Sequence, residues 1–303
     1  MLSVFDTAMK TSYEPASASE PCYGRAVATP AFRLGEPDSA EVLAFLAIDP
    51  VPTVVMSSYI ADNGIVSALN RGTFFGHRDE RGELDGVALI GHATLVEARS
   101  DEAMEALARV AKNPAVPTHL IMSNGDAAQR FFDLMTDGLG EVRLRCVEDR
   151  FEAAFPFAVQ TCEYTIKNAD ISQLEPVAQA QAEIAFLECG VDPMVRDREG
   201  FLKRVARRIE QGRVFSVVED GKLMFKADII AETNKTIYLE GVYVDPEYRG
   251  KGIGSRCLAD LTAHLLSRAP NICLLSNVDF TKAHRSFEKA GYHRTGQCVT
   301  LFV

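Results

Sequence analysis

The sequence predicts an α+β fold made of two similar domains in tandem. The chain has 303 residues, more than one domain of ordinary size needs. After about residue 30 the order of helical and strand patterns occurs twice, in copies of roughly 130–140 residues. In each copy two helices precede a hairpin, and the copy ends with a strand, a helix and a last strand. This repeated order indicates two sheets, each flanked by helices.

The first half alternates between helical and strand periodicity. DEAMEALARVAKN has the spacing of an amphipathic helix, THLIMSN is a short buried strand, and Gly138 ends a helix. The expected elements are helices over 38–47 and 51–64, a hairpin with a polar Gly-containing turn over 73–98, a helix over 101–113, a strand over 118–124, a helix over 126–138 and a strand over 141–155.

The second half repeats this order and contains a tight hairpin. The turn is Glu219-Asp220-Gly221, because an Asp-Gly pair adopts the positive φ angles that a two-residue turn requires. The expected elements are strands over 161–169, 236–244, 271–277 and the last residues, a hairpin over 213–232, and helices over 174–190, 198–212, 255–269 and 281–291.

The domain boundaries follow from composition. Residues 1–28 are rich in Ala, Ser, Pro and Glu with few apolar residues, which predicts a loose or draped tail. The two repeated patterns meet just after Phe155-Pro156. The predicted domains are therefore 29–158 and 159–303.

Charge and hydropathy exclude several function classes. The formal net charge is −10, whereas binding phosphates needs a cationic surface, so no nucleic-acid partner is expected. No apolar run reaches the ~18 residues of a membrane span, so no membrane partner is expected. The only apolar stretch among the first residues contains Asp6, and no cationic residues precede it, so no secretory signal is expected. A cytoplasmic protein is the prediction.

The seven cysteines predict neither a disulfide framework nor a metal site. They are scattered and odd in number, and no C-x-x-C pair occurs, as in the reduced proteins of the cytosol. None has a histidine partner in a motif that would make it a nucleophile. The six histidines include no pair at metal-ligand spacing on one helix, so no metal is expected.

RGKGIG, residues 249–254, lies between a strand and a helix and is the most informative motif. A triphosphate loop would need G-x-x-x-x-G-K-[ST], but Gly252 follows the Gly250-Lys251 step. A dinucleotide fingerprint, G-x-G-x-x-G, fails at Ser255, and no acidic residue lies about 20 positions further on. The stretch does match a third pattern, R-x-x-G-x-G.

This third pattern has the properties of a pyrophosphate site. Glycines lack a Cβ, so successive backbone N–H groups can turn toward an anion and approach it closely. The following helix adds unpaired N–H groups and the positive end of its dipole. Arg249 and Lys251 supply balancing charge. The alternative is a glycine-rich turn that only reverses the chain, although such turns rarely place cations at a helix start.

LEGVYVDPEYRGKGIGSRCL closely resembles the acyl-CoA-binding core of the GNAT superfamily of N-acyltransferases. The resemblance covers about residues 161–303 and includes LLSN followed by AHRSFEKAGY. The whole chain resembles two-part members in which a degenerate GNAT-like half precedes the working one. This resemblance implies a mixed, mostly antiparallel twisted sheet in each half. In the working half it also implies that the fourth and fifth strands splay apart to admit the pantetheine arm.

The resemblance also implies which residues hold acetyl-CoA, the expected cosubstrate. The backbone of Val242, Tyr243 and Val244 would pair with pantetheine. The pyrophosphate would be held by Arg249, Gly250, Lys251, Gly252, Ile253, Gly254 and Ser255. At the corresponding place the first half reads Glu97-Ala98-Arg99-Ser100-Asp101-Glu102, without glycine and with three carboxylates. The first half is therefore predicted to bind no CoA, and either shapes the acceptor site or buries a pseudo-dimer face.

Glu240 is the candidate catalytic residue. The acceptor in this family is usually an amine, and an ammonium of pKa near ~10.4 must lose a proton before it attacks a thioester. Glu240 precedes Val244 by four residues, which predicts a place roughly 13 Å back along the strand and on the same face. LEGVYV also resembles the strand of some aminoglycoside N-acetyltransferases in which a carboxylate meets a substrate ammonium. The role of Glu240 as general base, as amine anchor or as both is left open. The alternative is that Glu240 is an ordinary carboxylate exposed to water at the end of the strand.

One departure from the family pattern concerns the general acid. Phe287 stands where many members have a tyrosine that protonates the leaving thiolate. A positioned acid is typically worth ~10²–10⁴-fold in rate. Water, Tyr243 or Tyr292 would have to substitute, while Phe287 remains a candidate for cofactor contact.

A second departure concerns the start of the same helix. The family's helix-start asparagine falls on Phe280, so Asn277, at the strand end, is expected to contact pantetheine together with Phe280. His284 lies in the same region and is a further candidate for cofactor contact. The alternative for His284 is a polar surface position.

Charged residues leave the acceptor open. The basic helical region is either a solvated face or a receptor for an anionic group, and it comprises Arg196, Arg198, Lys203, Arg204, Arg207, Arg208 and Arg213. Glu183 and Glu188 on the preceding helix could instead attract a cationic acceptor.

The sequence predicts an N-acetyltransferase that moves an acetyl group directly from acetyl-CoA to a small-molecule or peptide amine, as a monomer or homodimer. Two alternatives remain. One is a catalytically weak or inactive CoA-binding sensor or scaffold, because Phe287 has no proton to give. The other is a protein-interaction module built on the first half.

Overall fold

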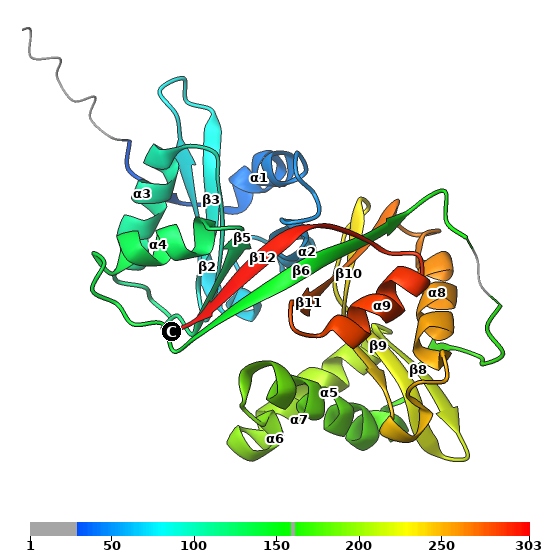
Figure 1. Ribbon diagram of the computed structural model, residues 1–303. Helices are drawn as coiled ribbons and strands as arrows, with labels where there is room; N and C mark the ends of the chain where they lie inside the picture. The colour runs from blue at the N-terminus through cyan, green and yellow to red at the C-terminus, as the bar shows by residue number, and fades with distance from the viewer. Residues whose placement is uncertain (1–28, 159–160) are drawn as a thin grey trace, which may run out of the picture.

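The computed structural model describes residues 29–158 and 161–303, whose strands form one 12-stranded mixed sheet with helices on both faces (Figure 1). The predicted α+β fold of two similar halves is confirmed. Residues 1–28, predicted to be a tail, and residues 159–160, at the predicted domain boundary, lie outside the described residues. The division into domains at this boundary stays a prediction.

The first half has the predicted order of elements, with one difference. Residues 73–98 form three strands and not one hairpin, because the chain reverses again at Gly91 and His92 after the polar turn that contains Gly82. In chain order the elements are β1 (Phe32–Arg33), η1 (Glu36–Asp38), α1 (Ser39–Leu46), α2 (Val54–Asn63), η2 (Ala68–Asn70), β2 (Gly72–Arg78), β3 (Leu84–Gly91), β4 (Ala93–Ala98), α3 (Asp101–Ala111), β5 (Leu120–Asn124), α4 (Ala127–Met135) and β6 (Leu144–Ala154).

The second half also has the predicted order, except near its start. The expected strand over 161–169 is wrong for most of its length: only β7 is paired, and Cys162, Tyr164 and Ile166 alternate because they pack against the core. The elements are β7 (Lys167–Asn168), η3 (Ile171–Gln173), α5 (Leu174–Cys189), α6 (Pro193–Arg196), α7 (Arg198–Glu210), β8 (Val214–Glu219), β9 (Lys222–Glu232), β10 (Thr236–Val244), η4 (Pro246–Tyr248), α8 (Ile253–Leu265), β11 (Asn271–Asn277), α9 (Thr281–Lys289) and β12 (His293–Phe302).

The two halves exchange their last strands. β6 of the first half pairs antiparallel with β11 of the second, and β12 of the second pairs antiparallel with β5 of the first. β6 and β12 also pair with each other, which gives the central order β5-β12-β6-β11. Figure 1 shows them as two long strands that run side by side between the halves. The two predicted sheets are therefore continuous, and β6 carries side chains of the first half into the second.

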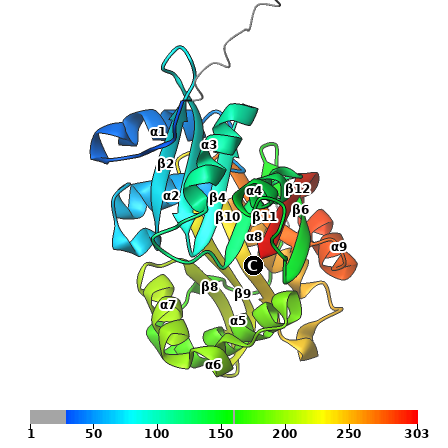
Figure 2. The same cartoon turned by 90° about the vertical axis from the view of Figure 1, so that its left-hand side faces the viewer.

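Helices cover both faces of this sheet. In the first half α1 and α2 pack on one face, and α3 and α4 pack on the other (Figures 1 and 2). In the second half α8 and α9 cover one face, and α5 and α7 cover the other. α2 also reaches the second half, where Val54 packs with Tyr238 and Cys273. Because Arg213 Nη1 also lies 2.8 Å from Asp62 Oδ2, the halves are joined by both apolar and ionic contacts.

β10 and β11 separate after a short parallel ladder. The ladder runs from the Thr236–Asn271 pair to the Leu239–Leu274 pair, and it leaves residues 240–244 unpaired on that side. This is the predicted separation of the fourth and fifth strands of the second half. Backbone N–H and C=O groups of β10 are thereby available to a ligand.

A bulge in β10 changes which side chains share a face. Between Glu240 and Tyr243, three residues of β10 span two residues of β9. Such a bulge reverses the alternation of faces beyond it. The expectation that Glu240 and Val244 share a face is therefore wrong. Tyr243 packs with the α5 side, whereas Val244 packs with the core under α8.

Residues 29–158 and 161–303 contain neither a membrane-spanning helix nor a group of side chains suited to a metal ion. No helix there is long and apolar enough to cross a membrane. No group of three or more His, Cys, Asp or Glu side chains there is arranged to hold a metal ion.

Candidate active site

A cavity of about 630 Å³ opens where β10 and β11 separate. It is lined by β10, the start of α8, α9, α5 and one residue of β6, Glu148. This volume falls within the 300–1,000 Å³ range typical of small-molecule sites. The cavity is therefore large enough for an extended ligand that enters between the two strands.

The glycine loop at one wall of the cavity presents free backbone N–H groups. α8 begins at Ile253, and no described side chain caps its first N–H groups, because the N-cap is Gly252. Gly250 and Gly252 have φ of 77° and 75°, values that side chains disfavour. A Cβ on Gly254 would lie 2.8 Å from Val244 Cγ2. These residues fit an anionic group at a helix N-terminus.

Cations surround this loop and extend along α9. Arg249 lines the cavity, donates from Nε to the Val244 carbonyl oxygen at 2.7 Å, and lies 3.2 Å from Glu183 Oε1. Lys282, Arg285 and Lys289 line the cavity from α9. The sequence reasoning missed these three, although their i, i+3, i+7 spacing places them on one helix face.

The structure brings most of the predicted site residues to this cavity. Those that line it are Glu240, Val242, Tyr243, Val244, Arg249, Gly250, Gly252, Ile253, Gly254, Ser255, Phe280 and Phe287. Lys251 is outside the lining, with Nζ 5.5 Å from the Tyr248 ring centroid. Asn277 is outside it too, and its Oδ1 accepts from the Asp279 N–H at 3.0 Å, which shapes the turn into α9.

His284 is placed differently from both expectations. It is buried, neither on the surface nor in the lining of the cavity. Nε2 lies 3.0 Å from the Asn277 carbonyl oxygen, and Nδ1 lies 3.8 Å from Asp149 Oδ2 on β6. Asp149 also pairs with Arg294. His284 thus connects α9 to the exchanged strand.

A group of carboxylates also lines the cavity. Glu148 of β6, Glu188 of α5 and Glu240 of β10 all line the cavity. Glu148 accepts a hydrogen bond from Thr300 Oγ1 at 3.0 Å. Within the described ranges, no side chain or N–H group donates a hydrogen bond to the carboxylate of Glu188 or Glu240. The sequence reasoning missed Glu148 because its strand belongs to the first half.

Burial and mutual repulsion keep protons on these groups. Burial, followed by the charges of Glu240 and Glu148, raises the pKa of Glu188 to about 8. Burial raises the pKa of Glu148 to about 7, and Glu240 adds to this shift. Burial raises the pKa of Glu240 as well, against the opposing charges of Arg208 and Lys226. Near neutral pH the cluster is therefore only partly ionised.

Lys226 supports the bulge that carries Glu240. It is completely buried on β9, and its Nζ donates to Gln181 Oε1, Asp228 Oδ1 and the Gly241 carbonyl oxygen, at 2.8, 2.8 and 3.0 Å. Gly241 has φ of 61°, and a Cβ there would lie 2.6 Å from Nζ. Because all three Nζ donors are used, Lys226 holds the backbone beside Glu240 in one conformation.

Two tyrosines were considered as substitutes for the acid that Phe287 lacks. Tyr292 is completely buried, and its hydroxyl lies 2.7 Å from Thr262 Oγ1, away from the cavity. Tyr243 lines the cavity and donates to Glu183 Oε2 at 3.1 Å. Burial and the charge of Glu183 raise the pKa of Tyr243 to about 12. Tyr243 therefore keeps its proton and is the better placed of the two.

The first half is built differently at the corresponding place. Ser100 caps α3 by accepting from the Ala103 N–H at 3.0 Å, and it donates to Asp85 at 2.6 Å. Arg99 stacks on the Phe45 ring. The helix start that corresponds to the glycine loop is therefore occupied by the chain's own side chains.

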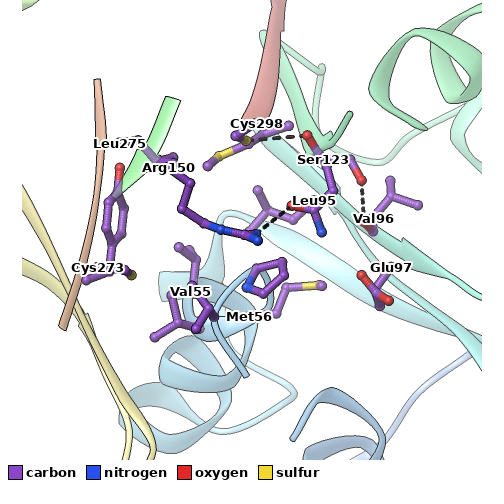
Figure 3. Close-up of a pocket in the computed structure, with 16 residues that line it drawn as sticks. Val55, Met56, Leu95, Val96, Glu97, Ser123, Arg150, Cys273, Leu275 and Cys298 are labelled. Atoms are coloured by element: carbon purple, nitrogen blue, oxygen red, sulfur yellow. Dashed lines mark hydrogen bonds between the residues drawn. The ribbon is translucent and has the colours of Figure 1, made fainter. Parts of the chain in front are cut away.

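A small cavity lies beside β4 and β5 of the first half (Figure 3). Its volume is about 40 Å³, far smaller than the 630 Å³ of the cavity between β10 and β11. Figure 3 shows Arg150 pointing into it, and Ser123 Oγ donates to the Val96 carbonyl oxygen at 2.9 Å. The corresponding gap between strands of the first half is therefore nearly filled.

Glu188→Gln is expected to stabilise the protein at about pH 8 and not at about pH 5. The folded state keeps protons on Glu188 and Glu148 up to pKa values of about 8 and 7, whereas unfolded glutamates ionise near ~4.3. Folding thus binds protons in this window, and stability falls as the pH rises through it. Glutamine at position 188 does not ionise, so the variant lacks the fall in stability that Glu188 causes as the pH rises. Thermal unfolding at both pH values measures the effect, and an equal change in Tm at the two would contradict it.

Other titratable groups face this cluster, and the variant leaves them in place. They are Tyr59 of α2, Glu183 of α5, Arg208 of α7, Lys226 and Asp228 of β9, and Tyr238 and Glu240 of β10. The comparison of wild type and variant at each pH therefore isolates the contribution of Glu188.

The comparisons with known proteins agree with this architecture. Residues 175–292 match the acetyltransferase (GNAT) family. Thialysine N-epsilon-acetyltransferase of Sus scrofa is 40% identical over 50 residues, which is 16% of this chain and 29% of that protein. The chain thus matches under a third of the length of this curated relative.

Two solved structures have the same overall fold. A GCN5-related N-acetyltransferase from Sphaerobacter thermophilus has a TM-score of 0.56 at 13% identity, over 91% of this chain and 95% of that one. A tandem GNAT protein from the clavulanic acid biosynthesis pathway has a TM-score of 0.55 at 12% identity, over 90% and 97%. Residues 175–292 belong to the GNAT family of acetyltransferases, and the chain as a whole has the fold of tandem GNAT proteins.

Proposed function

We propose that this protein transfers an acetyl group from acetyl-CoA to an amine in the cavity between β10 and β11. One observation carries the proposal. The uncapped glycine start of α8 and the unpaired edge of β10 open onto the same cavity as the half-buried carboxylate of Glu240. A site for an anionic, strand-like ligand therefore adjoins a group able to accept a proton. Membership of residues 175–292 in an acetyltransferase family supports this function.

The residues of the cavity fit acetyl-CoA as cosubstrate. The backbone of residues 242–244 is unpaired on the side of β11 and is available to the amide groups of pantetheine. The N–H groups of the loop at Gly250 and Gly252 and of the first turn of α8 would hold the pyrophosphate, with Arg249 and the α9 cations supplying charge. Bound there, acetyl-CoA supplies an activated acyl group.

Glu240 is the group proposed to accept the proton of the amine. As the nitrogen of the acceptor attacks the thioester carbonyl, a C–N bond forms, the C–S bond breaks and the thiolate leaves. A carboxylate with a raised pKa is a better base near neutral pH than one of ordinary pKa, provided that it is ionised. Tyr243, held by Glu183, is the described hydroxyl best placed to protonate the leaving sulfur. Glu240 and Tyr243 lie on one face because of the bulge.

The first half is proposed to bind no CoA and to complete the site of the second half. Its helix start is closed by Ser100, its cavity holds about 40 Å³, and its last strand supplies Glu148 to the larger cavity. The name of the Sus scrofa relative, an N-acetyltransferase of an amino acid side chain, supports an amine as acceptor.

Two measurements on the full chain test this function. Calorimetry is expected to show acetyl-CoA binding, and a thiol-reactive dye is expected to detect free CoA when an amine is added. Binding without thiol release for any amine would overturn the transferase and favour the sensor. No heat with acetyl-CoA would overturn both.

A further inference from the structure

We infer that the acceptor is an alkyl amine with a second positive charge, and that Glu148 and Glu188 bind this second charge beside Glu240. This inference names the substrate class of the proposed transferase and therefore rests on that function. It rests on three properties of the carboxylates that line the cavity. These are the hydrogen-bond partners that they lack, the excess of negative charge that they create, and the half of the chain from which each one comes.

Two of the carboxylates lack hydrogen-bond partners. Glu240 and Glu188 are both half-buried, and neither accepts a hydrogen bond from a described residue, although both open onto the cavity. A buried carboxylate without a partner is costly, so folds retain one mainly where a ligand or a reaction uses it. An ammonium donates three hydrogen bonds and fits such a gap.

The carboxylates around Glu240 outnumber the cations beside them. Around the cluster, Asp228 is already paired with Lys226 at 2.8 Å and with Arg208 at 3.2 Å. Glu183 is paired with Arg249. A cation bound beside them favours the ionised forms of Glu148, Glu188 and Glu240. With all three ionised, these glutamates and Asp228 exceed Lys226 and Arg208 by two charges. An acceptor with two positive charges balances this excess, whereas a monoamine, with one positive charge, leaves one negative charge unbalanced.

The alternative is an anionic acceptor. The basic helical region could serve an acidic acceptor only if its cations were available, but five of its seven cations are paired internally. Arg198 pairs with Glu175, Lys203 with Glu199 and Arg204 with Asp197. Arg208 and Arg213 pair with Asp228 and Asp62. Most of this region is therefore a surface held by ion pairs, and only Arg196 and Arg207 have no ion pair within the described ranges, so it gives little support to an anionic acceptor.

Both halves of the chain supply residues to this site. Glu148 comes from β6, which the strand exchange places next to β11, in register with Asn277. The second half alone would lack this carboxylate. A binding site completed by both halves gives the first half a role in acceptor selection without any CoA site of its own.

A set of amines that each contain four carbons tests the inference. Butylamine, diaminobutane and gamma-aminobutyrate share a four-carbon chain and differ at the far end, which is apolar, cationic or anionic. Thiol release with saturating acetyl-CoA is expected to give diaminobutane a kcat/KM at least about tenfold above that of butylamine, and to be lowest with gamma-aminobutyrate. Equal values for the first two, or a preference for the anion, would overturn the inference.

Two variants assign the effect to the cluster. Glu148→Gln and Glu188→Gln are each expected to raise the KM for diaminobutane by at least about tenfold while changing the KM for butylamine by less than about threefold. Glu175→Gln, on α5 but paired with Arg198 far from the cavity, is the control and should change neither. A parallel change for both amines would overturn the inference.

The outcomes also separate this inference from the proposed function. If no amine in a broad panel yields free CoA, the transferase itself is overturned. If amines do react but the far-end charge has no effect, the transferase stands and only the acceptor class is overturned.

Discussion

Glu240→Gln is expected to lower the turnover of acetyl-CoA with an amine by about 10²–10⁴-fold, the usual contribution of a positioned general base. Glutamine keeps the size of the side chain but cannot accept a proton. Acetyl-CoA binding should change little, because the loop and the backbone of residues 242–244 are the parts proposed to hold the cofactor, and the side chain of Glu240 belongs to neither. Steady-state thiol release and calorimetry on the same preparation measure the two effects.

The pH profile of this variant adds a second readout. Without Glu240, only water or hydroxide removes the proton, so the remaining activity should rise steadily with pH toward the pKa of the amine, near ~10.4. Wild type should instead reach a plateau once Glu240 is ionised. A variant with the profile and turnover of wild type would rule out Glu240 as the base.

The first half provides a matched control for this experiment. β4 and β10 each begin a parallel ladder, at Ala93 and Thr236, and Glu97 and Glu240 are both the fourth residue after that point. Burial raises the pKa of Glu97 as well. Glu97 lines the small cavity of the first half, where the glycine loop has no counterpart. Glu97→Gln is therefore expected to leave turnover unchanged.

The parts of the site that are local in sequence could be predicted from it. The loop at 249–255 depends on glycines, a strand before it and a helix after it, all within about 20 residues, so its conformation follows from short-range rules. Most of its residues line the cavity as expected. The repeated order of elements likewise predicted the fold, because helix and strand periods are read locally.

The parts that depend on distant pairing could not be predicted. Glu148 enters the cavity only because β6 pairs with β11 and not within its own half, and no pattern within residues 141–155 encodes that choice. His284 was treated as a surface or cofactor residue, because nothing near it in sequence reveals Asp149 on the same exchanged strand. Side chains brought together by strand exchange leave no local trace.

The bulge in β10 shows a different limit. Simple alternation places Glu240 and Val244 on one face, yet one extra residue moves Tyr243 to the face of Glu240. Gly241, with φ of 61°, is compatible with a bulge, but its carbonyl oxygen is held by the buried Lys226, which lies 15 positions earlier. Face assignments beyond a glycine in a strand therefore need the partner strand as well as the sequence.

Gly252→Val is expected to weaken acetyl-CoA binding by at least about 100-fold, the second of the two largest effects. Gly252 has φ of 75°, and a side chain in this region costs about 1–2 kcal/mol, so valine drives the loop toward another conformation. The N–H groups at the start of α8 would then no longer converge on the pyrophosphate. Calorimetry with acetyl-CoA measures the loss. The smaller Gly252→Ala variant keeps the test decisive should valine impair folding.

Gly82→Val separates the loss of binding from the backbone strain. Gly82 has φ of 82° in the turn between β2 and β3, and a Cβ there meets no atom within 4 Å. Its replacement should cause a similar decrease in Tm, because the same region of backbone space is involved, while acetyl-CoA binds as in wild type. If Gly252→Val and Gly82→Val lose stability equally and both still bind acetyl-CoA, the pyrophosphate is held elsewhere. The glycine loop would then be only a turn, because its positive φ angles would serve chain reversal and not the approach of an anion.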